Sequence, residues 1–136
     1  MPENKTVSIA MITSQKIDGD RDTQTAELTG TLWFKESAAH LIYEENGTKT
    51  HLRIGDKLVH IHRLGELSGD LWFAEGEERD TRYETPYGRM ILTIHTHRIR
   101  WDEKRLTLAI RYNVLAEGRL VSMNEMNIEM KEKVNE

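Results

Sequence analysis

The chain has 136 residues, a formal net charge of −4 and a charged fraction of 31%. This length suits one domain with one hydrophobic core, and the composition fits a globular protein rather than a disordered one. The absence of cysteine excludes a disulfide scaffold, thiol catalysis and a cysteine-ligated zinc site. The mild acidity argues against an overall phosphate-binding surface but leaves room for a local basic patch.

The N-terminal segment and the hydropathy of the chain predict neither a secretory signal nor a transmembrane helix. The segment Met1–Lys5 lacks the apolar stretch of a secretory signal, and no long uncharged apolar run follows it. We therefore expect a cytoplasmic protein that does not associate with a membrane. We predict a single domain over residues 1–136, with a frayed polar tail from about residue 131.

Alternation of apolar and polar residues dominates the chain, in rows that begin at Val7, Ala26, Met90 and Leu106. Short segments rich in Gly, Asn and Asp separate these rows, and no apolar row has helical spacing. Such a pattern predicts roughly nine or ten short antiparallel strands. We expect an all-β protein, a single antiparallel up-and-down β-barrel, with a β-sandwich as the main alternative.

The dipeptide Asn46-Gly47 is a strong signal for a two-residue type I′ hairpin. A turn there places Leu41 opposite Leu52 on an apolar face and Glu44 opposite Lys49 on a polar face. We expect the apolar face to line the interior of the barrel.

A group of histidines falls on the polar face. If Gly55-Asp56 forms a two-residue type II′ turn, His51 lies directly opposite His60, and His62 shares their face. Three neutral imidazoles are suitable ligands for zinc, nickel or iron, although exposed strand histidines are also ordinary surface residues. A metal-binding module or metal-dependent enzyme that uses these residues is therefore an alternative function, and no cofactor is predicted.

The barrel interior offers a second kind of site. Small closed barrels can hold one ligand in an apolar lumen with a few polar anchors. Tyr43 and Tyr112 fall on the predicted inner rows, and Arg98 lies at the end of the row that begins at Met90. A guanidinium binds a carboxylate in a two-point fork, so these three residues are candidate ligand anchors. The plainer alternative is that the tyrosines fill the core and Arg98 leaves the barrel at its rim.

Two tryptophans suggest a third function. Trp33 and Trp72 fall on the outward rows of their strands by simple alternation. If both are exposed, they mark a contact between two copies of the chain, so a homodimeric interaction module is a further alternative. They could equally cover the ends of the barrel.

A small basic group surrounds one predicted hairpin, with Arg98, Arg100 and Arg105 close to Trp101. Arginine beside an aromatic ring is a feature of nucleic-acid surfaces, but the acidic total argues against one here. We therefore predict no nucleic-acid partner.

The second half of the chain resembles the YwiB-like family of bacterial proteins. The resemblance rests on Arg63-x-Gly65, Leu71-Trp72-Phe73-x-x-Gly76, the distinctive Tyr83-x-Thr85-Pro86-Tyr87-Gly88, Thr96 and Tyr112. It extends from about Val7 to Met130, although the N-terminal third matches only in strand pattern. The resemblance implies a calycin-type, lipocalin-like barrel in the bacterial cytoplasm with a ligand cavity, and it supplies no catalytic residues. The leading expectation is non-enzymatic binding of a small apolar or amphipathic molecule.

Overall fold

The structure, a computed structural model, describes residues 4–133. Ten β-strands make up this range: β1 (Lys5–Ile17), β2 (Asp20–Lys35), β3 (Ala38–Glu45), β4 (Thr48–Ile54), β5 (Leu58–Gly65), β6 (Ser68–Ala74), β7 (Glu78–Thr85), β8 (Gly88–Asp102), β9 (Thr107–Ala116) and β10 (Arg119–Glu132). Each strand pairs with the next along the chain, and β1 pairs with β10, which closes the sheet. The predicted all-β, antiparallel up-and-down barrel is confirmed. The described residues contain no helix able to cross a membrane.

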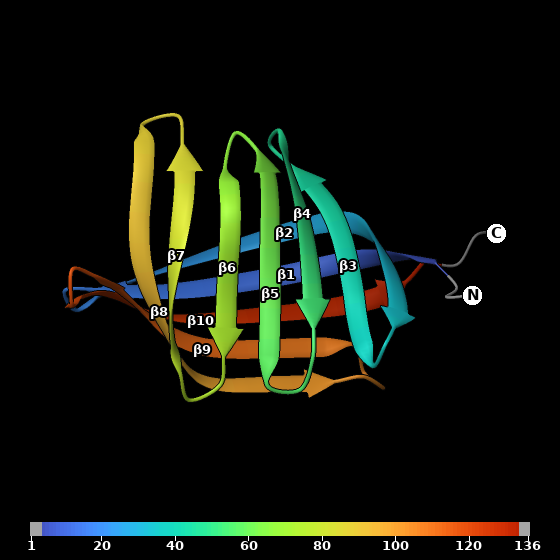
Figure 1. Cartoon of the computed structure of the whole chain (residues 1–136). Helices are drawn as coiled ribbons and strands as arrows, with labels where there is room; N and C mark the ends of the chain where they lie inside the picture. The colour runs from blue at the N-terminus through green and yellow to red at the C-terminus, as the bar shows by residue number, and fades with distance from the viewer. Residues whose placement is uncertain (1–3, 134–136) are drawn as a thin grey trace.

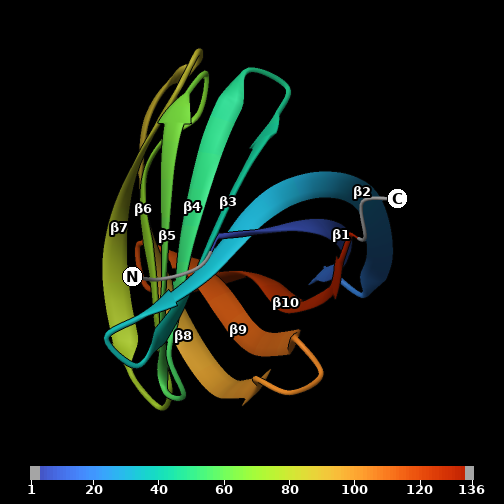
Figure 2. The ribbon, with the colours of Figure 1, turned by 90° about the vertical axis from the view of Figure 1, so that its right-hand side faces the viewer.

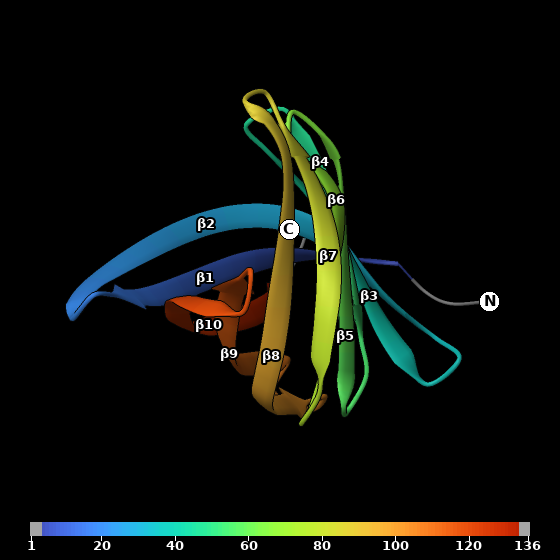
Figure 3. The same ribbon diagram turned by 60° about the vertical axis from the view of Figure 1, so that its left-hand side comes forward.

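The barrel is flattened into two layers whose strands cross. Strands β3–β7 run across the direction of β1, β2, β9 and β10 (Figures 1 and 3), and Figure 2 shows the second group closing the other side. The long strands β2 and β8, of 16 and 15 residues, belong to both layers because each bends at a corner. Bends and bulges are the usual means by which a strand changes sheet.

Each corner has a local cause. In β2, a Cβ on Gly30 would lie 2.6 Å from the backbone oxygen of Ile42, so only glycine allows β3 to approach this closely. In β8, the pairing with β9 shifts by one residue between Thr96 and Arg98. Such a β-bulge bends the strand and moves the following side chains to the opposite face.

The hairpin register was predictable at one turn and wrong at the next. Asn46 and Gly47 both have positive φ, and Leu41 pairs with Leu52, as predicted. The following turn is centred on Asp56 and Lys57 rather than on Gly55 and Asp56, because the Gly55 N–H donates to the carbonyl oxygen of Leu58 at 2.9 Å and Ile54 pairs with Val59. The predicted β4–β5 register is therefore off by two residues, which leaves every side chain on its predicted face.

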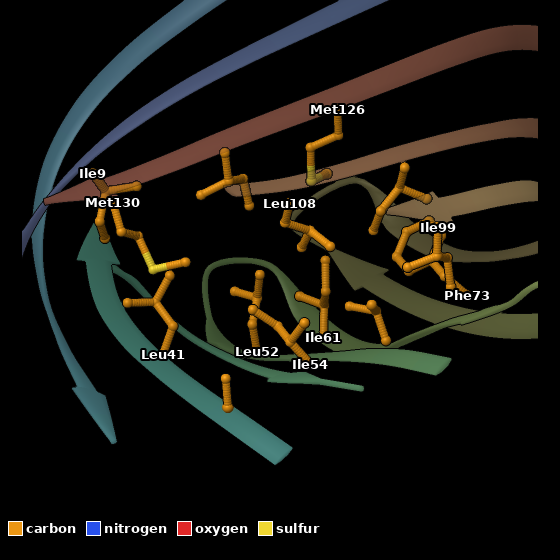
Figure 4. Close-up of a cluster of buried hydrophobic side chains, with 14 of the residues drawn as sticks. Ile9, Leu41, Leu52, Ile54, Ile61, Phe73, Ile99, Leu108, Met126 and Met130 are labelled. Atoms are coloured by element: carbon orange, nitrogen blue, oxygen red, sulfur yellow. The ribbon is translucent and has the colours of Figure 1, made fainter. Parts of the chain in front are cut away.

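The core fills the middle of the barrel. Side chains from the two crossing layers meet there (Figure 4), and Leu41, Leu52, Ile61 and Leu108 are at most 1% exposed. Complete burial of each such side chain contributes about 1.5–3 kcal/mol. The expected open lumen is thus occupied by the protein's own side chains over much of its length.

The predicted polar tail begins within strand β10. β10 continues to Glu132, which pairs with Val7, and Met130 is only 2% exposed. This pairing closes the barrel, so the chain stays in the sheet for as long as β1 provides a partner. The rest of the predicted tail, residues 134–136, lies outside the described residues.

Candidate functional site

Arg98 does not face the barrel interior. The alternation that placed it there is interrupted by the β8 bulge, so Thr96 and Ile99 point inward, at 0% and 6% exposure, while Arg98 is exposed. The prediction of an inward Arg98 is therefore wrong, because one extra residue in a strand exchanges its two faces.

The inward arginine is Arg63, near the end of β5. It continues the row of the buried residues Val59 and Ile61 and pairs with Thr50 of β4. Its Nη1 donates a hydrogen bond of 2.5 Å to the hydroxyl oxygen of Tyr83, and its Cζ lies 5.9 Å from the centre of that ring. Strand alternation thus delivers a charged group to the inner face near the C-terminal end of β5, the end marked by the arrowhead of that strand in Figure 1.

Three tyrosines lie near this guanidinium. Burial raises the pKa of Tyr43 and of Tyr112, although the Arg63 charge opposes both rises, so both phenols are neutral near pH 7. Burial also acts to lower the pKa of Arg63, but Tyr83, which accepts its hydrogen bond, opposes this effect and the pKa lies above its usual value. Tyr112 is further held by an edge-on contact with Phe73, at 4.8 Å between ring centres. The structure therefore brings Tyr43 and Tyr83 beside Arg63, whereas the contact shown for Tyr112 is with Phe73.

A glycine in the next strand makes room for Tyr83. Gly69 of β6 pairs with Tyr83 and has φ +152°, and a Cβ there would lie 2.9 Å from the Tyr83 ring and 2.6 Å from the backbone oxygen of Arg82. Any other residue at Gly69 would displace the ring that hydrogen-bonds Arg63. Close backbone approach is a common reason for glycine within a strand.

The distinctive segment from Tyr83 to Gly88 builds one wall of the site. Tyr83 contacts Arg63, while the Thr85 hydroxyl donates to the Gly88 carbonyl oxygen at 3.0 Å and accepts from the Tyr87 N–H at 3.1 Å. These bonds shape the β7–β8 turn and leave the Tyr87 side chain fully exposed. A hydroxyl that bonds its own turn in this way is a common turn-stabilising device.

Arg63 and this wall border a pocket of about 420 Å³ between the β3–β4, β5–β6 and β7–β8 turns. Its deep part is made by Arg63 with the buried residues Tyr43, Thr48 and Thr50. Its exposed rim consists of Glu45, Asn46, Glu66, Pro86 and Tyr87. Within residues 4–133, no carboxylate forms an ion pair with Arg63. The pocket therefore has a cation in its depth and carboxylates only at its mouth.

The histidines form two groups on the outer face. The corrected register places His51 opposite His62 rather than His60, and His51 Nε2 lies 3.0 Å from Nδ1 of His40. His60 and His62 hydrogen-bond the same oxygen of Asp70, at 2.7 and 2.9 Å. Burial acts to raise the pKa of Asp70, but the bonds from the two histidines outweigh it and lower that pKa.

The first histidine group is held in its neutral form. Burial is the main cause that lowers the pKa of His40 and of His51, and neighbouring cationic groups lower both further. Among the residues that the structure describes, no three His, Asp or Glu side chains have an arrangement that could hold a metal ion. Metal binding by His51, His60 and His62 stays a prediction.

Both predicted tryptophans lie on the outer face, each against a histidine. The Trp33 ring stacks on His40 at 5.1 Å and 8°, and the Trp72 ring stacks on His60 at 3.8 Å and 7°. Each is half-buried, because its histidine covers one face of the indole. The homodimer predicted from these residues stays a prediction.

Sequence reasoning missed the role of Glu75, in the β6–β7 turn. Its Oε2 accepts a hydrogen bond of 2.8 Å from the N–H of Ile99, directly after the bulge. The next residue, Gly76, donates its N–H to the carbonyl oxygen of Thr96 at 2.8 Å. A run of glutamates around a glycine resembles a solvated loop, and no local signal indicates a partner more than twenty residues away.

Comparison with known proteins identifies a relative of the same fold. The match is "Crystal structure of ywiB protein from Bacillus subtilis", with a TM-score of 0.86 and 18% sequence identity over 98% of this chain and 96% of that one. No curated protein matches the chain. A family profile described as "Domain of unknown function (DUF1934)" matches residues 9–128. These findings confirm the predicted resemblance, and the chain belongs to the DUF1934 family.

Proposed function

We propose that the protein binds a small amphipathic molecule at the barrel mouth, with an anionic group of the ligand on Arg63. The observation that carries this proposal is a partly buried guanidinium whose hydrogen-bond partner is a phenol, at the base of a 420 Å³ pocket. A guanidinium has five N–H donors, and phenols that stay neutral cannot balance its charge. A ligand carboxylate supplies both the acceptors and the charge, in a two-point geometry.

The rest of the pocket favours an apolar body. Tyr43 lies in its depth, and Leu67, Pro86 and Tyr87 offer apolar surface nearer the mouth. Pockets with an apolar lining and a single charged anchor are typical of small-ligand sites. The lumen itself is filled, so the ligand occupies the mouth and not the centre of the barrel. This replaces Arg98 by Arg63 in the predicted set of anchors and keeps Tyr43, whereas Tyr112 does not line the pocket.

The rim restricts the outer end of the ligand. Glu45 and Glu66 are exposed, and the Glu66 side chain lies near the β3–β4 turn, since a Cβ on Gly47 would lie 3.6 Å from its Cδ. The carboxylates of Glu45 and Glu66 at the pocket mouth would repel a second anionic group of the ligand and attract a cationic one. The preferred ligand therefore has its carboxylate at the inner end and a neutral or cationic group at the outer end.

Isothermal titration with three related probes tests the proposal: 3-phenylpropanoate, 3-[4-(aminomethyl)phenyl]propanoate, which carries an ammonium at the end opposite its carboxylate, and phenethylamine. We expect both carboxylates to bind and the amine without a carboxylate to bind least. The substitution Arg63→Met removes a charge-assisted hydrogen bond, so carboxylate affinity should fall about 10- to 100-fold. Arg53→Met is the matched control, because Arg53 lies on the outer face of β4. Equal affinities in the two variants, or no binding of either carboxylate, would contradict the proposal.

A further inference from the structure

A second cationic site lies on the opposite face of the sheet, outside the barrel. Arg98 of β8 and Arg111 of β9 are directly opposite each other in the ladder, and both are exposed. Like charges directly opposite in an antiparallel pair are destabilising. The β8 bulge creates this pair, because it turns Arg98 outward and into register with Arg111.

The neighbouring positions form two rows across β8, β9 and β10. In the first row, Arg98 pairs with Arg111 and Arg111 pairs with Glu125; in the second, Arg100 pairs with Ala109 and Ala109 with Asn127. The small Ala109 side chain lies between longer ones, and these residues line a depression of about 230 Å³. Alternation and register alone thus place three guanidiniums around one concave surface.

The depression has too few carboxylates for its cations. Arg111 Nη2 lies 3.8 Å from Glu125 Oε2, and the Asn127 amide also donates to Glu125, at 3.4 Å. Neither Arg98 nor Arg100 forms an ion pair within the part of the chain that the structure describes. Three guanidiniums and one carboxylate leave a charge of +2 in this depression, although the whole chain carries −4.

We propose that this depression binds a phosphate group, held by Arg98, Arg100 and Arg111. A phosphate monoester carries a charge of about −1.5 to −2 near pH 7 and three strong acceptor oxygens, which match the excess charge and the guanidinium donors. Planar guanidiniums bind phosphate through paired hydrogen bonds. The ligand also removes the repulsion between Arg98 and Arg111. This site does not depend on the pocket at Arg63, which lies on the inner face.

Titration with inorganic phosphate, at an ionic strength held constant with chloride, tests the site. The informative variant is Arg98→Gln, and the matched control is Arg105→Gln, which removes the same charge from an exposed turn residue near Asp102. We expect Arg98→Gln to weaken phosphate binding about tenfold or more and Arg105→Gln to change it less than about twofold. Equal losses in the two variants, or no loss in Arg98→Gln, would overturn the proposal.

Two further measurements complete the test. Without phosphate, the Arg98→Gln variant should unfold at a urea concentration equal to or higher than that of the wild type, because the substitution removes a like-charge pair. A marked loss of stability would show that Arg98 has a structural role, and it would overturn the proposal. A 12-nucleotide single-stranded oligothymidylate identifies the source of the phosphate. Binding tighter than inorganic phosphate, lost in Arg98→Gln, supports a nucleic-acid backbone, whereas binding no tighter supports a small phosphorylated molecule.

Discussion

Arg63 and Tyr83 provide a direct test of whether the inward cation serves binding or stability. The two single substitutions Arg63→Met and Tyr83→Phe, and the double substitution, form a double-mutant cycle. Each substitution removes one partner of the 2.5 Å hydrogen bond and keeps a side chain of similar size. The cycle therefore isolates the interaction between the guanidinium and the phenol.

The expected free energies follow from what each change leaves behind. Tyr83→Phe leaves the partly buried guanidinium without its phenol acceptor, and a hydrogen bond to a charged group contributes about 1.5–3 kcal/mol. Arg63→Met removes the charge itself but leaves the buried Tyr83 hydroxyl without its hydrogen-bond partner, so we expect a loss of about 1–3 kcal/mol. In the Arg63→Met background, Tyr83→Phe should then cost less than about 1 kcal/mol, which gives a coupling of roughly 1.5 kcal/mol.

Urea denaturation followed by tryptophan fluorescence measures these values, since the chain has three tryptophans. For a chain of this length, an unfolding entropy of about 2.1 cal/mol/K per residue makes 2 kcal/mol equivalent to about 7 °C in Tm. A loss above about 3 kcal/mol for Arg63→Met would show that the arginine supports the fold, and it would remove the main reason to assign it to a ligand. An equal cost of Tyr83→Phe in both backgrounds would refute the coupling.

Three further predictions concern other parts of the barrel. The hydroxyl of Thr96 is buried without a hydrogen-bond partner among the described residues, so Thr96→Val should raise the urea midpoint, with a gain of about 1 kcal/mol; a loss above about 1 kcal/mol would contradict this. Glu75→Ala should cost about 1.5–3 kcal/mol because it removes the acceptor for the Ile99 N–H, whereas Glu75→Gln should retain most of the stability; equal losses would refute the role of that acceptor. The pKa values of His40 and His51 are lowered in the folded state, so below about pH 6.5 the unfolded chain binds more protons than the folded chain. The free energy of unfolding should therefore fall on acidification from pH 7 to pH 5.5. His51→Asn should make that dependence shallower, and an unchanged slope would contradict the assignment.

The faces of most strands could be predicted from the sequence because alternation is a local property. The Asn46-Gly47 turn determines the β3–β4 register by itself, since a type I′ turn needs positive φ at both positions. The next turn was ambiguous, because the run Gly55-Asp56-Lys57 allows a two-residue turn at Gly55-Asp56 or one residue later at Asp56-Lys57. Register between strands depends on where the turn lies, and the side-chain pattern determines it only to within two residues.

Only part of the candidate site could be predicted from the sequence, because alternation assigns a residue to the correct face only where no bulge interrupts its strand. Tyr43 and Tyr112 lie on uninterrupted rows, whereas Arg98 follows a bulge that moves every later side chain of β8 to the other face. The sequence does contain a signal for the bulge: the apolar positions change from even numbers, ending at Ile94, to odd numbers, beginning at Ile99. The same rule of alternation identifies Arg63, which is two residues after the buried Ile61.

The bulge links the two proposed sites and explains why net charge predicts neither. Because alternate residues of a strand face different surroundings, the sign of a site depends on which charges share a face and not on their sum. In β8, one extra residue places Ile99 against the core and moves Arg98 to the outer face beside Arg111. Among the described strands, the only guanidinium that points into the barrel is therefore that of Arg63, on β5. Glu75 holds this arrangement by accepting from the Ile99 N–H. Loss of that acceptor should therefore weaken phosphate binding outside the barrel more than carboxylate binding at its mouth.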